Sequence, residues 1–248
     1  MTTLDATPAP ALLPGRDRVA QWGIAAITLM LVAAPLIPIL YQSFSDRPLY
    51  DGMGRLSLDN YVNLFGSAEF LKVIWNTLAL GALTTVIGTA IGVVAAIVIG
   101  RTDMPGRALI GEMLIWPLYI SHLVLGFGFS VMYGPSGYVT LSLAQALGDA
   151  PWDLYTIPGM AIICAVAQAP VTYLFCIAST QAADPSLEDA ARISGARPFR
   201  ALWSISMPLL RPAIVYAVIL NFTVALELLA IPLLFGRPAG YEFLTTYL

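Results

Sequence analysis

One stretch of sequence decides the fold class. Residues 73–100, VIWNTLALGALTTVIGTAIGVVAAIVIG, contain no charged side chain over 28 positions. As an α-helix this stretch would measure about 42 Å, at 1.5 Å per residue, whereas the hydrocarbon core of a bilayer is about 30 Å thick. It therefore predicts a helix that spans a membrane.

The composition of the whole chain agrees with this prediction. Of its 248 residues 58% are hydrophobic and only 11% are charged, and the mean hydropathy is +0.78. Soluble domains carry about 25% charged residues, so this chain has too few to cover a water-facing surface. The composition excludes a soluble enzyme, a disordered chain and a collagen-like repeat. The net charge of −3, without a basic run, gives no indication of nucleic acid. We expect an all-α integral membrane protein.

Gaps between the charged residues predict five spans. Four gaps hold no charge, and the gap between Arg211 and Arg237 holds only Glu227. The spans are expected near residues 20–41, 73–99, 109–133, 157–179 and 213–235. Such long apolar runs argue against a strand barrel. The run from Gly23 to Leu40 exceeds the roughly 7–15 apolar residues of a signal peptide, so we expect it to remain as a helix.

Positive charges predict the orientation, because loops on the cytoplasmic side carry an excess of Lys and Arg. With the N-terminus inside, eight of these residues are cytoplasmic and four lie outside. The cytoplasmic set is Arg16, Arg18, Arg101, Arg107, Arg192, Arg197, Arg200 and Arg211, and the outer set is Arg47, Arg55, Lys72 and Arg237. We therefore expect a multi-pass protein of the inner (plasma) membrane, surrounded by lipid, with a cytoplasmic N-terminus.

Rare residue types limit the chemistry. The only lysine is Lys72, and no G-x-x-x-x-G-K-[ST] phosphate loop surrounds it. The only histidine is His122, and Cys164 and Cys176 have no close partner in sequence, so we expect no metal site, no cofactor and no enzyme. His122 is either a neutral residue hydrogen-bonded to other helices or a proton-relay or gating group.

The segment between the fourth and fifth spans, DPSLEDAARISGARPFR (184–200), has the features of a helix–turn–helix elbow. Ser186 and Asp189 approximate a capping box, and Gly195 suits the left-handed residue that follows a helix. Pro198 suits the first turn of a second helix, which is expected to end at a break at Met207–Pro208. These features alone also fit an ordinary amphipathic connector at the membrane surface.

The spacing in this segment resembles a motif of permease subunits of binding-protein-dependent ABC importers, E-A-A-x3-G-x9-I-x-L-P. Asp189, Ala190 and Ala191 take the first three places, with Gly195, Ile205, Met207 and Pro208 in the later ones. Asp replaces Glu and Met replaces Leu, and Glu188 lies one residue early. Trp75-Asn76-Thr77 and the stretch 101–107, RTDMPGR, are also typical of these subunits.

The resemblance implies a MetI-like type I importer fold, in which the elbow docks on a separate ATPase subunit dimer. The residues expected to carry this coupling are Glu188, Asp189, Ala190, Ala191, Arg192, Gly195, Arg197, Ile205 and Pro208. Further partners implied are a second permease half or copy and an extracytoplasmic solute-binding protein.

The composition of the N-terminal part and the resemblance of the rest together divide the chain. We expect a disordered cytoplasmic leader at 1–18, a first span with its external loop at 19–69, and a MetI-like domain at 70–248 with its coupling loop at 180–212. The family normally ends with one more helix, whereas this sequence stops at Leu248. We expect either a fragment or the first part of a longer, fused permease.

Two further groups of residues within the predicted spans are candidates for helix packing or transport. Small residues recur every fourth position at Thr84, Gly88, Gly92, Ala96 and Gly100, which predicts a close helix contact within the chain or with the second permease half. Glu227 is either a structural hydrogen-bonding group or part of a transport path, to which Asn221 and His122 would also contribute.

The sequence around Glu227 resembles the ferric iron, thiamine and polyamine branch of these permeases. The favoured function is the membrane-spanning subunit of an ATP-driven importer, with ferric iron as the first candidate substrate and polyamine or thiamine next. The alternatives are a proton-coupled secondary transporter that uses Glu227 and His122, and a membrane scaffold without transport activity.

Overall fold

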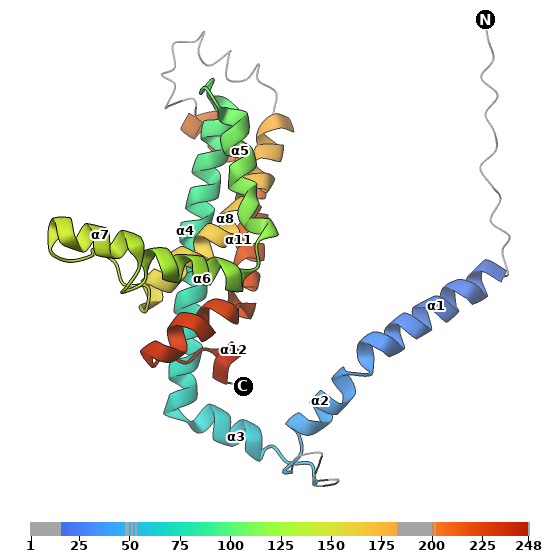
Figure 1. Ribbon diagram of the computed structural model, residues 1–248. Helices are drawn as coiled ribbons and strands as arrows, with labels where there is room; N and C mark the ends of the chain where they lie inside the picture. Colours follow the sequence, from blue (N-terminus) through green and yellow to red (C-terminus); the bar gives the residue numbers. More distant parts are fainter. Residues whose placement is uncertain are drawn as a thin grey trace, which may run out of the picture. The chain divides into compact units, whose positions relative to one another are not determined.

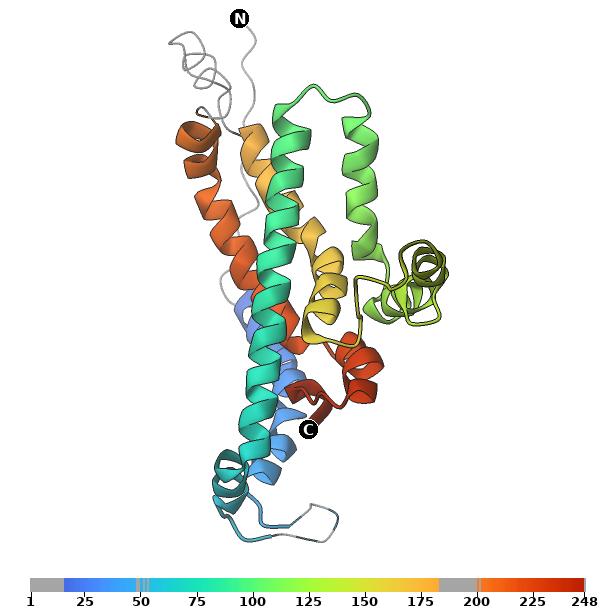
Figure 2. The same cartoon turned by 90° about the vertical axis from the view of Figure 1, so that its left-hand side faces the viewer.

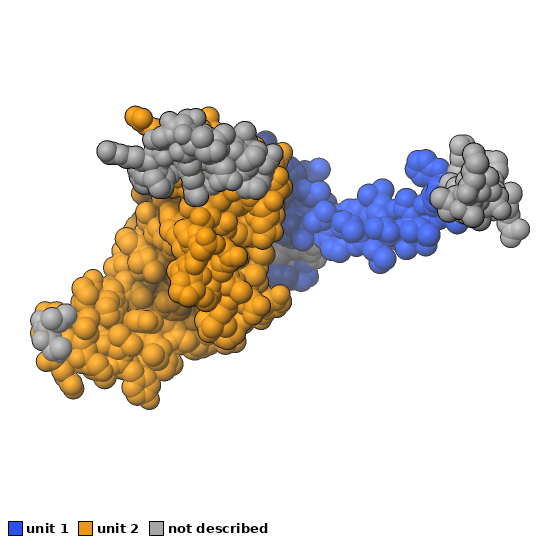
Figure 3. Space-filling model, turned by 90° about the horizontal axis from the view of Figure 1, so that it is seen from above, with its two compact units in different colours: residues 1–68 blue, residues 69–248 orange. Residues whose placement is uncertain are grey.

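The computed structural model describes residues 16–47, 50, 52, 54–182, 200 and 202–247. The chain forms two compact units, Met1–Ala68 and Glu69–Leu248, which Figure 3 shows in different colours.

The first unit contains one apolar helical stretch and a short connecting helix. Helices α1 (Arg16–Ala33) and α2 (Leu36–Ser43) form a candidate membrane span over Val19–Ser43, interrupted at Pro35, which lacks a backbone N–H. This stretch contains the predicted first span. Helix α3 (Asp59–Gly66) follows, and the Asn60 side-chain amide donates to the Ser45 carbonyl (2.9 Å), which ties α3 to the end of α2.

The second unit is built on three long helices that lie side by side (Figures 1 and 2). They are α4 (Ala68–Arg101), α8 (Ile157–Ala182) and α11 (Met207–Glu227), the last preceded by a π-helical turn, η3 (Leu202–Ser206). Helix α8 runs in the same direction as α4, because the small residues of α4 meet α8 in rising order along both helices. Helix α11 runs in the opposite direction, because Leu226 near its end lies against Gly81 near the start of α4.

Residues spaced four apart hold these helices together. On α4 the face of small residues lies against α8: a Cβ placed on Gly88 would be 3.3 Å from the Ala165 carbonyl oxygen, and one on Gly92 only 2.5 Å from Thr172 Cβ. Matching faces on the other two helices are buried: Cys164, Gln168, Thr172, Cys176 and Thr180 on α8, and Ala213, Ala217, Asn221 and Ala225 on α11. Of the two alternatives left open by the sequence, the structure shows contact within the chain. Small side chains at this spacing allow the helix backbones to approach closely.

The predicted third span, 109–133, is wrong as a single helix. Helix α5 (Arg107–Ile115) and the 3-10 turn η2 (Trp116–Tyr119) lead into α6 (His122–Tyr133), and the chain bends by 110° between them. Pro117 lies in η2, and the Ser121 hydroxyl accepts a hydrogen bond from the Val124 N–H (3.3 Å), which starts a new helix after the bend. Helix α7 (Tyr138–Leu147) completes this part of the chain.

The predicted fifth span, 213–235, is also displaced. The apolar helical stretch is Leu202–Glu227, so Met207 and Pro208 continue a helix instead of breaking it. Pro208 lies in the first turn of α11, directly after the π-helical turn η3. After Glu227 the chain forms only short helical turns, η4 (Pro232–Gly236), η5 (Arg237–Ala239) and α12 (Leu244–Tyr247).

This last segment folds into the core at the end of the second unit where α4 begins, the Ala68 end. Phe235 and Phe243 are fully buried in one apolar cluster with Leu80 and Met160. The Thr77 hydroxyl accepts a hydrogen bond from the Leu244 N–H (2.9 Å), so the segment is tied to the start of α4.

The prediction of an all-α membrane protein is confirmed. Among the described residues, four helical stretches are long and apolar enough to span a membrane, and the bent pair 107–145 would make a fifth. Helices α4 and α8 contain the predicted spans 73–99 and 157–179.

Candidate functional site

Most of the predicted coupling loop lies outside the described residues. This applies to Glu188, Asp189, Ala190, Ala191, Arg192, Gly195 and Arg197. Of the remaining motif positions, Ile205 is half-buried in η3 and Pro208 is half-buried in the first turn of α11.

The helices on either side of this loop have their adjoining ends at the same end of the unit. Because α8 and α11 are antiparallel neighbours, the end of α8 and the start of η3, which flank the segment outside the described residues, both lie at the Arg101 end of the unit. The loop between α4 and α5 lies at the same end, and there Arg107 pairs with Asp103 (3.3 Å). The described residues that flank the predicted coupling loop thus lie at an end of the unit that carries charged residues.

A polar layer crosses the interior between α8 and α11. The Asn221 side-chain amide donates to Thr172 Oγ1 (2.8 Å), and both residues are almost fully buried. One turn earlier on α8, Gln168 is 2% exposed, and neither its amide nitrogen nor its amide oxygen has a hydrogen-bond partner among the described residues. Asn221 is therefore a packing residue in this structure, whereas Gln168 was not singled out from the sequence.

Glu227 lies on a different face of α11 from Asn221. It is the last residue of the helix and is exposed, like Thr223 and Tyr216, which lie four and eleven positions earlier on the same face. Its carboxylate has no ion-pair or hydrogen-bond partner in the part of the chain that the structure describes. The negative end of the helix dipole adds no stabilisation for a carboxylate there.

His122 begins α6, directly after the bend. Its side chain is half-buried, and no hydrogen bond joins it to another described residue. The structure thus places His122 on the bent segment and Glu227 at the end of α11.

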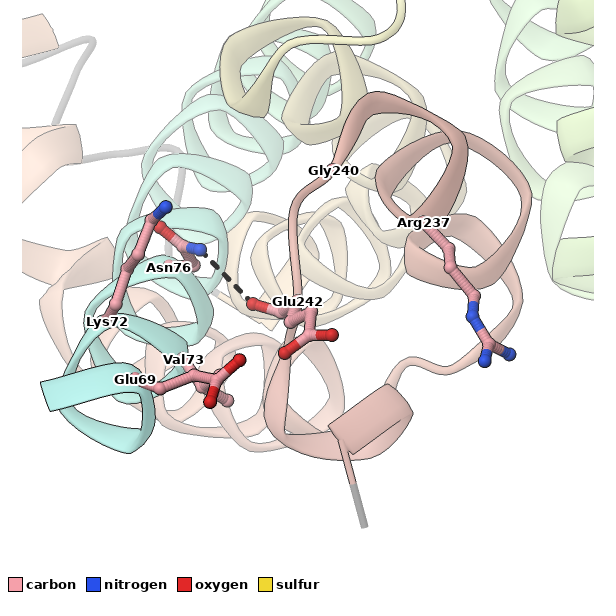
Figure 4. Close-up of a pocket in the computed structure, with 7 residues that line it drawn as sticks. All are labelled: Glu69, Lys72, Val73, Asn76, Arg237, Gly240 and Glu242. Atoms are coloured by element: carbon pink, nitrogen blue, oxygen red, sulfur yellow. Dashed lines mark hydrogen bonds between the residues drawn. The ribbon is translucent and has the colours of Figure 1, made fainter. Parts of the chain in front are cut away.

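A charged pocket of about 230 Å³ lies at the Ala68 end of the unit (Figure 4). The first turns of α4 contribute Glu69, Lys72 and Asn76, and the segment after α11 contributes Arg237 and Glu242. The Asn76 amide donates to the Glu242 carbonyl (3.2 Å), which holds the two walls together. In Figure 4 the Glu69 and Glu242 carboxylates approach the pocket from opposite walls, while the Arg237 side chain extends away from α4.

The pocket combines two acidic and two basic side chains, all exposed. No ion pair joins these four side chains to one another. Nowhere in the described ranges do three His, Cys, Asp or Glu side chains converge as a metal site would require. A mixed-charge surface of this kind suits contact with a polar partner surface.

This pocket was not predicted from the sequence. The predicted orientation places Lys72 and Arg237 on the same side of the membrane, but it does not indicate that the two residues are close. The folding back of residues 240–247 onto α4, which brings Glu242 to Asn76, depends on contacts between residues 166 positions apart.

Comparisons with known proteins identify the class of protein. The family described as binding-protein-dependent transport system inner membrane component matches residues 88–248, and the chain belongs to this family. The predicted resemblance to ABC importer permeases is thereby confirmed.

Two relatives and one solved structure give detail. The chain is 26% identical over 196 residues to the sulfate transport system permease protein CysW of Synechocystis sp., covering 78% of this chain and 65% of the relative. It is 29% identical over 216 residues to the ferric transport system permease protein FbpB of Actinobacillus pleuropneumoniae, covering 86% of this chain and 30% of the relative. A chain of a bacterial alginate ABC transporter, solved in complex with an alginate pentasaccharide-bound periplasmic protein, has the same fold (TM-score 0.74, 21% identity, 94% of this chain and 83% of that one).

Proposed function

We propose that the chain is the membrane-spanning subunit of an ATP-driven importer, which receives a solute from an extracytoplasmic binding protein. The family match over residues 88–248, which includes the whole E-A-A-like motif, carries this proposal. The sequence has no phosphate loop, so ATP hydrolysis is assigned to a separate ATPase dimer. A second permease half or copy completes the path.

The coupling loop is the first part of this proposal to test. Asp189→Arg and Gly195→Trp, introduced separately into the full chain, should abolish co-purification of an ATPase subunit from membranes while the chain remains inserted. Asp103→Asn is the matched control, since Asp103 lies in another loop at the same end of the unit and should leave capture unchanged. Equal capture by all variants would contradict the assignment of the loop.

The charged pocket of Figure 4 provides a test of the proposed orientation. With the N-terminus in the cytoplasm, the Ala68 end faces outward, and the pocket is the surface that a solute-binding protein would meet. A cysteine at Ala239, which is exposed beside the pocket, should react with a membrane-impermeant maleimide from outside the cell. A cysteine at Asp103 should not react, and the reverse pattern would invert the orientation.

For the transport path we propose the exposed face of α11 that carries Tyr216, Thr223 and Glu227. An unpaired carboxylate on a membrane-spanning helix is unfavourable in lipid, so a water-filled path or a second subunit is expected to cover it. His122 remains a candidate for the same path. Asn221 is left out, because its amide is used by Thr172.

Ferric iron is the proposed substrate, with polyamine or thiamine next, because a carboxylate near the mouth of the path suits a cation. The relatives named for sulfate and for ferric transport make sulfate the necessary comparison. Glu227→Gln should reduce iron uptake at least about tenfold, which corresponds to about 1.4 kcal/mol, and Asp59→Asn serves as an exposed-carboxylate control. Uptake of sulfate instead of iron would contradict the substrate assignment.

The alternative is a proton-coupled secondary transporter that uses Glu227 and His122. It predicts uptake into vesicles driven by a pH gradient in the absence of ATP and of any ATPase. The ATP-driven importer predicts no uptake under those conditions.

A further inference from the structure

We propose that the hairpin of α6 and α7, residues 122–147, lies along the plane of the bilayer and packs its exposed side chains against lipid acyl chains. The half of the membrane that it occupies is the one nearer the Ala68 end of the unit. This inference concerns a lipid contact and does not depend on the transported solute.

The length of the preceding helical segment sets the depth of the bend. Residues 107–119, which form α5 and η2, comprise 13 positions that begin beside the charged Arg101 end. At about 1.5 Å per residue they cover about 20 Å, which is about 10 Å less than the hydrocarbon thickness. The chain therefore turns by 110° while it is still inside the membrane.

Core contacts show toward which end of the unit α6 lies. Leu125 and Phe129 of α6 pack on the cluster that contains Leu80 and Cys164. Leu80 lies eight residues, or about 12 Å of helix, from the nearest charge of α4 at that end, Lys72. Leu80 also lies 21 residues, or about 32 Å of helix, from Arg101, which is close to the hydrocarbon thickness, so this contact places α6 near the hydrocarbon boundary at the Ala68 end.

The surface of the hairpin suits lipid. No charged residue occurs from Met113 to Gly148. Large apolar side chains on both helices are exposed, namely Leu123, Val124, Phe127, Val131, Met132 and Leu141. In water such a surface would be unfavourable, whereas acyl chains cover it without cost.

Several backbone groups at the turn between the helices form hydrogen bonds within the unit. The Gly134 N–H donates to the Ser130 carbonyl (2.9 Å), and the Gly137 N–H donates to the Gly134 carbonyl (2.9 Å). The Tyr133 carbonyl accepts a hydrogen bond from the Trp152 indole N–H (3.0 Å). Hydrogen bonds of this kind reduce the number of backbone groups that need water, which suits a turn at the membrane boundary.

Aromatic rings mark the boundary of the hairpin. Tyr133 and Trp152 contact each other edge to face, with ring centroids 5.7 Å apart. Asp149 and Asp153 follow directly in the sequence, so the chain returns to water beside these rings. Trp and Tyr are enriched at membrane–water interfaces, where the ring meets lipid and its polar group meets water.

Depth-dependent fluorescence quenching tests the proposal. The full chain, with Cys164→Ala and Cys176→Ala to remove its own thiols, receives single cysteines at Val131 or Leu141, one on each helix. Each is labelled with an environment-sensitive fluorophore and reconstituted into vesicles of phosphatidylcholine and phosphatidylglycerol. Labels at Val86, exposed on α4 in mid-span, and at Ala239 are the lipid and water references.

Spin-labelled lipid should quench the fluorescence of the labels at Val131→Cys and Leu141→Cys. A lipid with its spin label near the headgroup should quench more than a lipid with its spin label at the end of the acyl chain. Iodide should quench them at least about threefold less than it quenches Ala239→Cys, since water is excluded from that depth. Iodide quenching equal to that of Ala239→Cys would overturn the proposal by placing the hairpin in water. Quenching by neither agent would overturn it as well, because protein, such as a second copy of the chain, would then cover the hairpin. Only variants that elute from size-exclusion chromatography like the parent protein are compared. The two labelled sites lie on different helices, so they test the proposal independently.

Discussion

Helices α8 and α11 are almost equally apolar but differ greatly in burial. The mean hydropathy is 2.0 for Ile157–Ala182 and 1.9 for Leu202–Glu227, yet 72% of the most apolar stretch is buried in the first and 22% in the second. Helix α8 has small residues around its circumference, whereas α11 has them mainly on the face of Ala213, Ala217, Asn221 and Ala225.

This difference shows what hydropathy measures in a membrane protein. An apolar helix is stable in lipid whether or not another helix covers it, so hydropathy indicates only that it enters the membrane. Side-chain size decides how closely helices approach. Helix α8 is central because α4 and α11 can both pack on it, and large side chains of α11 such as Val215 and Ile219 remain exposed.

Truncation of one isoleucine on each helix should give the largest difference. Ile163→Ala in α8 removes a fully buried side chain and leaves a cavity, so it should lower the free energy of unfolding by about 4 kcal/mol. Ile219→Ala on the exposed face of α11 should change it by less than about 0.5 kcal/mol. Unfolding of the full chain in detergent measures both, and equal losses would show that a second subunit buries the α11 face.

Enlargement of a small residue tests the α4–α8 contact. Gly92→Leu forces atoms against Thr172 Cβ and the Ala169 carbonyl oxygen, 2.5 and 2.7 Å from the first added carbon, and should destabilise the chain by about 3 kcal/mol. Gly128→Leu, where nothing lies within 4 Å, is the control and should be close to neutral. Thermal unfolding compares the two. A neutral Gly92→Leu would contradict the close approach.

Removal of the buried amide on α8 should have an effect of the opposite sign. Gln168→Leu replaces a polar group that has no hydrogen-bond partner among the described residues, so it should stabilise the chain by about 1–2 kcal/mol. Gln145→Leu, at an exposed position of α7, should leave stability almost unchanged. Destabilisation by Gln168→Leu would mean that the amide has a partner in the folded protein, such as a bound water.

The smallest effect is expected for the hydrogen bond between α8 and α11. Asn221→Val removes the donor to Thr172 and should cost about 0.6 kcal/mol, with about 1.7 kcal/mol as an upper value. Thr223→Val is the control, because its hydroxyl bonds only to the Ile219 carbonyl of its own helix. A cost well above that range, with a neutral control, would indicate that Asn221 holds more than this one contact.

The sequence predicts single helices and motifs of the candidate site, but it does not predict which of their residues contact one another. The small residues from Thr84 to Gly100 indicated a packing face, since their spacing is a local property of one helix, and Gly88, Gly92 and Gly100 lie against α8. The position of Asn221 could not be read in this way, because its burial depends on Thr172, 49 residues earlier. The role of the E-A-A-like loop stays a prediction, since most of it lies outside the described residues.

The sequence by itself determined that the chain enters a membrane, roughly where α4 and α8 cross it, and which family motif it carries. Apolar length, charge spacing and motif spacing are all local properties. Only the tertiary structure decided that the third apolar stretch bends at η2, that α11 ends at Glu227, and that residues 240–247 return to the start of α4. It also separated the buried Asn221 from the exposed Glu227 on one helix. These outcomes depend on contacts between distant residues, which the hydropathy of a single stretch does not contain.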